Sequence, residues 1–163
     1  MLAIMHTERI TPSRTSRCVP AALAVRGRGL LVALPCWAVL LTAWSLTPRP
    51  AGFGTAEQLG LPACSWMTEK GIPCPTCGLT TSLAAAAQAD FVAAARAHAF
   101  GVVLFFGLVA LALTGTGQAL TGRNWLARIR FRLWWVVVAV VGLLGGWTVN
   151  LAAGYAAGQY PTH

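Results

Sequence analysis

Four residues in the middle of the chain are of types that bind metals or exchange electrons: Cys64, Cys74, Cys77 and His98. Two of the thiols stand at C-x-x-C spacing inside residues 71–80, where proline and glycine favour a tight turn. Such a turn points backbone N–H groups at two thiolates, and a structural zinc site normally takes four cysteine or histidine ligands. We therefore predict a metal site, with zinc as the expected ion, formed by these four residues.

Other uses of the same thiols are compatible with this spacing. Cys74 and Cys77 can form a structural disulfide, or either one can pair with Cys64. Alternatively Cys74 and Cys77 form a redox pair, since a helix N-terminus lowers the pKa of a thiol there and an extracytoplasmic compartment is oxidising. A redox enzyme also needs a route for electrons, and the sequence has no quinone or flavin signature. Two C-x-x-C turns meeting in a homodimer would likewise supply four metal ligands.

The elements that must position these residues are membrane helices. Apolar residues make up 56% of the chain and charged residues only 10%, whereas a soluble domain carries about 25% charged residues. Three charge-free runs are each long enough for the roughly 20 residues that cross a bilayer as a helix. Backbone polar groups in lipid must be satisfied within the segment. We predict an all-α membrane protein with three transmembrane helices, at residues 29–47, 99–120 and 133–155.

The basic residues gather on two segments of the chain. Of the 12 Lys and Arg residues, five precede the first span and four lie between the second and third spans. Cytoplasmic segments carry such an excess, so we predict a cytoplasmic N-terminus, an extracytoplasmic loop at 48–98 and an extracytoplasmic C-terminus. Anionic lipid headgroups explain the net charge of +8. Nucleic-acid binding is not expected.

The chain divides into a tail and a membrane domain. Residues 1–28 mix Thr, Ser, Pro and Arg without a sustained period, which predicts a disordered basic cytoplasmic tail before a membrane domain at 29–163. The predicted loop at 48–98, called here the cysteine loop, has apolar residues at every fourth position over 79–97 in its second half. This spacing predicts a short interfacial helix with one apolar stripe. Asp90 can instead cap a second short helix that begins at Phe91.

The cysteine loop resembles a known family. Cys64, a short spacer, the run G-I-P-C-P-T-C-G-L-T, an alanine-rich helix and an apolar span are similar to the bacterial membrane family called domain of unknown function 2752, over roughly residues 61–115. The family commonly has Arg where this chain has Thr81, and often Asn-Pro where it has His98-Ala99. The resemblance implies this architecture and a bacterial inner-membrane location. It carries no established activity.

From these features we predict a multi-pass, non-enzymatic membrane protein. Its extracytoplasmic cysteine site is structural, as a metal knuckle or a disulfide, and organises a loop that binds a partner. The expected partners are the lipid bilayer and either another membrane protein or a second copy of the chain. The alternative is a membrane thiol–disulfide oxidoreductase that uses Cys74 and Cys77. Proton-coupled transport is not expected, because no predicted span contains an acidic or basic residue.

Overall fold

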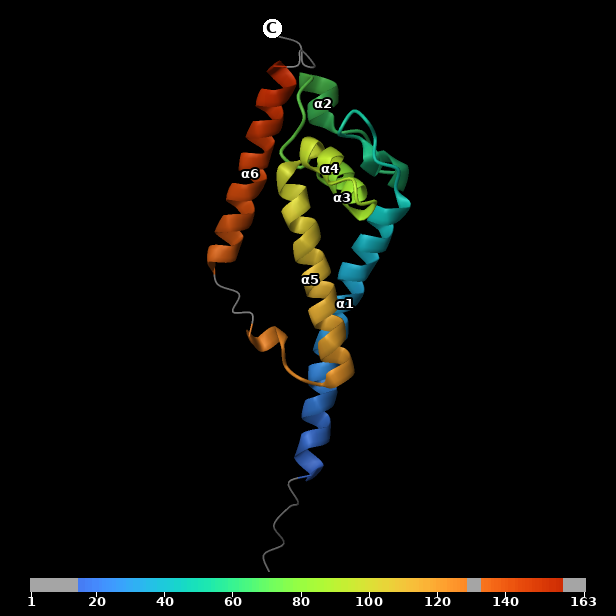
Figure 1. The fold of residues 1–163 in the computed structure, drawn as a ribbon, viewed down its shortest axis with the longest axis vertical. Coiled ribbons are helices and arrows are strands. Elements are labelled where there is room, and N and C mark those ends of the chain that lie inside the picture. Colours follow the sequence, from blue (N-terminus) through green and yellow to red (C-terminus); the bar gives the residue numbers. More distant parts are fainter. Residues whose placement is uncertain (1–14, 129–132, 157–163) are drawn as a thin grey trace, which may run out of the picture.

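The protein is built around three long helices. The computed structural model describes residues 15–128 and 133–156, which form six α-helices and two 3-10 turns and contain no strand (Figure 1). Three helices are long and apolar enough to cross a membrane: α1 (Thr15–Ser45), α5 (Ala99–Thr121) and α6 (Leu133–Ala156). The predicted all-α membrane fold with three spans is confirmed.

Helices α1 and α5 pack at small residues. A Cβ on Gly29 would lie 2.7 Å from the carbonyl oxygen of Gly115, and a Cβ on Gly115 would lie 2.9 Å from the carbonyl oxygen of Gly29. Ala33 is buried beside this contact. The Gln118 side-chain amide donates a 2.9 Å hydrogen bond to the Val25 carbonyl. Small residues let two membrane helices approach to backbone contact, so α1 and α5 form one tightly packed pair.

The structure corrects the predicted start of the first helix. Helix α1 begins at Thr15 rather than at residue 29, so residues 15–28 are helical and not a disordered tail. Residues 1–14 lie outside the described part of the chain. The two arginines at 26 and 28 interrupt the apolar run in the sequence, but residues 21–25 are mostly strong helix formers. Helix α5 also supports this stretch, since Gln118 contacts the Val25 carbonyl.

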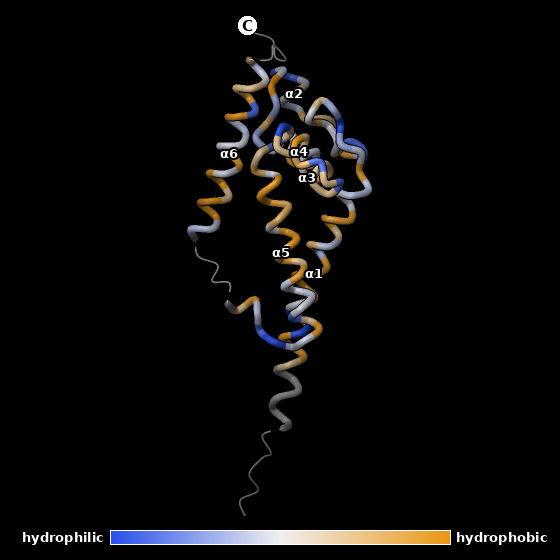
Figure 2. The backbone as a smooth tube through the Cα atoms, viewed as in Figure 1, coloured by the Kyte–Doolittle hydropathy of each residue, from blue (hydrophilic) through white to orange (hydrophobic). Residues whose placement is uncertain are grey.

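The remaining elements gather at the two ends of the helix pair (Figures 1 and 2). One end, called here the cysteine end, holds η1 (Thr55–Leu59), α2 (Ser65–Lys70), α3 (Leu79–Ala87) and α4 (Phe91–Ala97). The other, the arginine end, holds the loop after α5 with η2 (Leu126–Arg128). There Arg26 of α1 lies against Gly122. Arg26, from the first basic segment, and Arg123, which follows Gly122 in the second, therefore lie at the same end of the helix pair.

Two short helices replace the single helix predicted over residues 79–97. Asp90 separates them, because its carboxylate accepts a 2.9 Å hydrogen bond from the backbone N–H of Ala93 and so caps α4. Ala89, just before it, has a φ of +64°. The alternative of a second helix beginning at Phe91 is confirmed. The turn between α3 and α4 folds them against each other over the start of α5.

Helix α6 meets the other elements near the cysteine end. A Cβ on Gly142 would lie 2.5 Å from the ring of Phe100, and one on Gly146 would lie 2.6 Å from Cε1 of His98. Glycine at these two positions thus allows close contact with α6, whereas a Cβ on Gly145 would meet nothing within 4 Å. Side chains 134–141 are all exposed, and this half of α6 diverges from α5 (Figure 1).

Candidate metal centre

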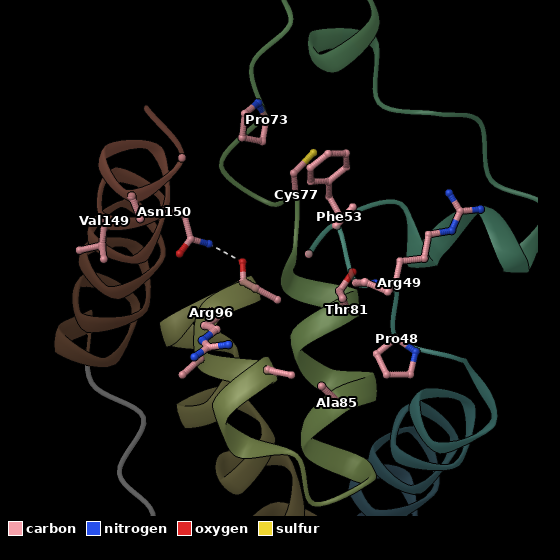
Figure 3. Close-up of a pocket in the computed structure, with 18 of the residues that line it drawn as sticks. Pro48, Arg49, Phe53, Pro73, Cys77, Thr81, Ala85, Arg96, Val149 and Asn150 are labelled. Carbon is pink, nitrogen blue, oxygen red and sulfur yellow. Dashed lines mark hydrogen bonds between the residues drawn. The ribbon is translucent and has the colours of Figure 1, made fainter. Parts of the chain in front are cut away.

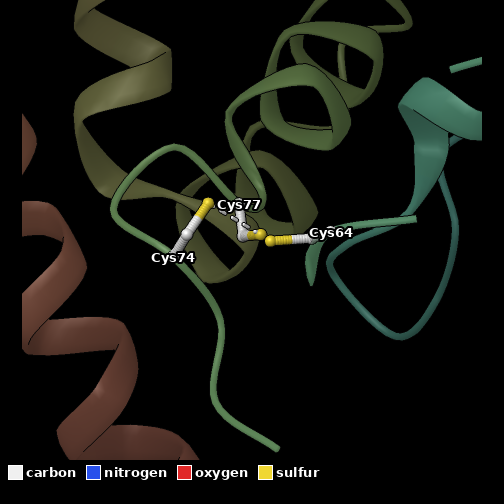
Figure 4. Close-up of side chains that lie close together, drawn as sticks. All are labelled: Cys64, Cys74 and Cys77. Carbon is white, nitrogen blue, oxygen red and sulfur yellow. Dashed lines mark hydrogen bonds between the residues drawn. The ribbon is translucent and has the colours of Figure 1, made fainter. Parts of the chain in front are cut away.

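Three cysteine sulfurs from two separate segments meet at the cysteine end (Figure 4). The Sγ atoms of Cys64, Cys74 and Cys77 all lie within 4.8 Å of one another. Those of Cys74 and Cys77 are 3.1 Å apart. A tetrahedral zinc with Zn–S bonds of about 2.3 Å holds its sulfurs about 3.8 Å apart. Small side-chain adjustments would therefore let all three sulfurs bind one ion.

The motif loop, residues 71–78, places two of these thiols by a turn that runs into α3. The Cys77 N–H donates a 2.9 Å hydrogen bond to the Cys74 carbonyl. Gly78 follows with a φ of +88° as the N-cap of α3. A Cβ at Gly78 would overlap the carbonyl oxygen of Ala97. Glycine is thus required twice, by the backbone conformation and by the close approach of the end of α4.

Cys64 reaches the site from the opposite side, as the N-cap of α2. Burial raises the pKa of its thiol, but hydrogen bonds from the Met67 N–H, from Cys77 and from Cys74 outweigh this and lower the pKa of Cys64 to about 7. A thiol with this pKa is substantially deprotonated at neutral pH. The thiolate is the form that binds metals, so Cys64 is already suited to be a ligand.

The pKa of the Cys77 thiol is shifted in the opposite direction. Burial raises the pKa of its thiol, and its hydrogen bonds to Cys74 and Cys64 raise that pKa further. Without a metal, the Cys77 thiol therefore keeps its proton beside the more acidic thiol of Cys64. A bound divalent cation would replace the proton of Cys77, because metal ligation requires deprotonated cysteine.

His98 lies outside the group of three sulfurs and points elsewhere. Its side chain is fully buried, with Nε2 3.3 Å from the carbonyl oxygen of Pro75. Because Nε2 faces an acceptor it carries the proton, and Nδ1, beside Gly146, has no hydrogen-bond partner among the described residues. Burial lowers the pKa of His98. The structure thus brings together three of the four predicted ligands and does not bring the fourth to them.

Two residues of α6, neither of them a predicted site residue, hold the neighbouring backbone. Trp147 donates a 2.8 Å hydrogen bond from Nε1 to the Pro73 carbonyl. Asn150 donates from its amide to the Ala97 carbonyl at the end of α4 (Figure 3). Gly146, Trp147 and Asn150 share one face of α6 by their spacing. The sequence shows Asn150 as a polar residue in an otherwise apolar span. It does not show that the Asn150 amide bonds to the Ala97 carbonyl.

A cavity of about 620 Å³ adjoins Cys77 (Figure 3). Its walls come from residues 48–53, from α3 and α4, and from the C-terminal half of α6, with Cys77 and Thr81 facing it. Thr81 is the residue at which this chain differs from the arginine noted for the family it resembles. It is buried, and its hydroxyl is 2.8 Å from that of Thr55. Arg49, also on the wall, forms a 2.8 Å ion pair with Glu57.

The comparisons with known proteins concern the same segment. A family model described as "Protein of unknown function (DUF2752)" matches residues 64–112. The resemblance is confirmed over this segment. The match begins at Cys64 and includes the motif loop, His98 and the first half of α5, so the whole thiol group lies inside it. The searches of curated proteins and of solved structures found no match.

Proposed function

We propose that this membrane protein holds one zinc ion on Cys64, Cys74 and Cys77, and that the ion fixes the structure of the cysteine loop. The observation that carries the proposal is the convergence of three thiols, two from the motif loop and one from the start of α2, within 4.8 Å. A disulfide would use two of them and leave the third without a role. One metal ion uses all three. The fourth position of a tetrahedral zinc is left for water or for a donor from another chain.

The segment that the ion would order carries exposed apolar side chains. Leu59 and Leu61 are about half exposed, and Trp66 is also exposed, with Lys70 4.6 Å above its ring. We propose this surface, defined by Leu59, Leu61 and Trp66, as the docking site for another membrane protein. A photo-crosslinking residue at position 66 should yield an adduct in native membranes. An adduct of twice the chain's mass would identify a second copy of the chain instead.

The distribution of basic residues supports an orientation of the protein in the membrane. Arg26 of the first basic segment and Arg123 of the second lie together at the arginine end, which supports a cytoplasmic arginine end and an extracytoplasmic cysteine end. We propose the bacterial inner membrane as the location, with the N-terminus in the cytoplasm and the C-terminus outside.

The decisive experiment is metal analysis of the purified protein, with thiols counted before and after reduction. Each of the changes Cys64→Ser, Cys74→Ser and Cys77→Ser removes a ligand, so zinc content should fall in all three variants. Cys36→Ala is the matched control, because Cys36 is a buried free thiol in α1 away from the site. Equal zinc content in the wild type and Cys77→Ser would refute the proposal.

A thiol–disulfide oxidoreductase is the second candidate, favoured by the 3.1 Å separation of the Cys74 and Cys77 sulfurs. In that reaction a Cys74–Cys77 disulfide would take two electrons and two protons from a dithiol, which becomes a disulfide. Cys64→Ser should then leave exchange nearly unchanged, while Cys74→Ser or Cys77→Ser abolishes it. A metal centre instead makes all three variants equivalent.

A further inference from the structure

Cys74 lies between two backbone carbonyls that other elements hold in place. On one side the indole of Trp147 donates to the Pro73 carbonyl at 2.8 Å. On the other side Nε2 of His98 is 3.3 Å from the Pro75 carbonyl. These two contacts come from α6 and from the junction of α4 and α5, far from the motif loop in sequence.

We propose that Trp147 and His98 are positioning residues for the metal centre. They fix the peptide groups on both sides of Cys74, so that its sulfur faces those of Cys64 and Cys77. The inference rests on the proposed function, because it concerns the same site. In this inference His98 orients a metal ligand instead of being one.

The motif loop depends on such contacts because it has few of its own. Pro73 and Pro75 have no N–H to donate, and their rings fix only the φ angle. Their ψ angles, which set the directions of the two carbonyls, stay free unless a donor holds each one. The Cys77 N–H to Cys74 carbonyl bond ties the turn after the first thiol. The carbonyls of Pro73 and Pro75 are tied by the indole and the imidazole.

The two donors are themselves held rigidly. The His98 ring is fully buried and packs over Gly146, where a Cβ would lie 2.9 Å from Nδ1. The Ser82 hydroxyl donates to the His98 carbonyl at 3.0 Å, and Trp147 is the residue after Gly146 on α6. Groups that orient metal ligands in this way typically change metal affinity by about 10–100-fold when they are removed.

The test is a Co²⁺ titration of the full-length protein in lipid nanodiscs, read by the thiolate-to-metal charge-transfer absorbance. Co²⁺ takes the same ligands as zinc but binds more weakly, so affinities are measurable. Trp147→Phe keeps an aromatic ring and removes the donor, and it should weaken Co²⁺ binding by about tenfold or more. Trp134→Phe is the matched control on the exposed half of the same helix. It should leave the affinity unchanged.

A second pair of variants separates positioning from ligation at position 98. Gln can donate to the Pro75 carbonyl in place of the imidazole, so His98→Gln should keep both the Co²⁺ affinity and the absorption spectrum. His98→Leu should weaken binding without changing the spectrum of the bound ion. If His98 were a ligand, His98→Gln would alter the spectrum, and that result would overturn the inference. This pair also decides the matter if Trp147→Phe does not fold.

Failure of the inference and failure of the proposed function give different results. Equal affinity in Trp147→Phe and Trp134→Phe, with normal binding by the wild type, would overturn the positioning role and leave the metal centre intact. Absence of Co²⁺ binding by the wild type would overturn the metal centre, and the positioning role with it.

Discussion

The contact between Gly146 and His98 leads to a prediction that compares two adjacent glycines of α6. In Gly146→Ala the new methyl group would lie 2.6 Å from Cε1 of the buried His98 ring, so the ring or the helix must move. In Gly145→Ala the new methyl group would meet nothing within 4 Å. Both changes make the same chemical substitution in the same helix. Any difference between them therefore reports the contact with His98.

The magnitudes follow from two opposing effects. Replacing a mid-helix glycine by alanine stabilises a helix by roughly 0.5–1 kcal/mol, because the unfolded chain loses freedom. Overpacking a tight contact costs about 1–3 kcal/mol. Gly145→Ala should therefore be stabilised by up to about 1 kcal/mol. Gly146→Ala should show a net destabilisation of up to about 2 kcal/mol, since His98 has little room to relax.

Thermal unfolding in detergent, followed by circular dichroism, measures this difference. For a chain of this size, 1 kcal/mol corresponds to a change in Tm of about 2–4 °C. Gly146→Ala should therefore melt several degrees below Gly145→Ala, and it should also bind Co²⁺ more weakly. Equal shifts in Tm for the two variants, in the same direction, would show that α6 does not pack on His98 as described.

Two further predictions concern pH and topology. Burial lowers the pKa of His98 below its ordinary value of 6.5, so just below pH 6.5 the unfolded chain takes up a proton that the folded chain does not. The free energy of unfolding should therefore fall as the pH drops through 6.5. A pH titration of Tm should show a smaller fall for His98→Gln than for the wild type, and an equal fall in the two proteins would contradict this. Cys18 precedes the first predicted span, and Cys64 lies in the cysteine loop. In intact cells, a membrane-impermeant thiol reagent should label Cys64 after reduction and metal removal, and should not label Cys18. Labelling of Cys18 alone would reverse the proposed orientation.

The spans could be predicted because a bilayer imposes a simple rule on the sequence. The charge-free runs gave α5 and the described part of α6 within one or two residues of the observed bounds. The rule failed at the start of α1. There the helix continues past Arg26 and Arg28, because α5 packs against it and the first residues need not be apolar. Hydropathy reports the solvent around a helix and not where its hydrogen bonds begin.

The thiols of the site could be predicted, but the residues around them could not. Cys74 and Cys77 are close in sequence, and their spacing implies a shared turn. The bond from Trp147 to Pro73 joins residues 74 positions apart. A contact between residues so far apart leaves no periodic pattern in the sequence. His98 was identified as part of the site from its residue type and proximity, yet the direction of its ring depends on the space that Gly146 leaves on another helix.

Helix α6 is packed unevenly along its length, so a movement at its packed part is larger at its free end. Its contacts are concentrated around Gly142, Gly146 and Asn150, while Trp134 at the other end is exposed. At 1.5 Å per residue, about 18 Å of helix separates Gly146 from Trp134. A tilt of about 10° at the contact with His98 would therefore displace the Trp134 end by about 3 Å. A small movement of α6 at its contact with His98 would therefore be amplified at the Trp134 end of the helix, where no packing among the described residues opposes it.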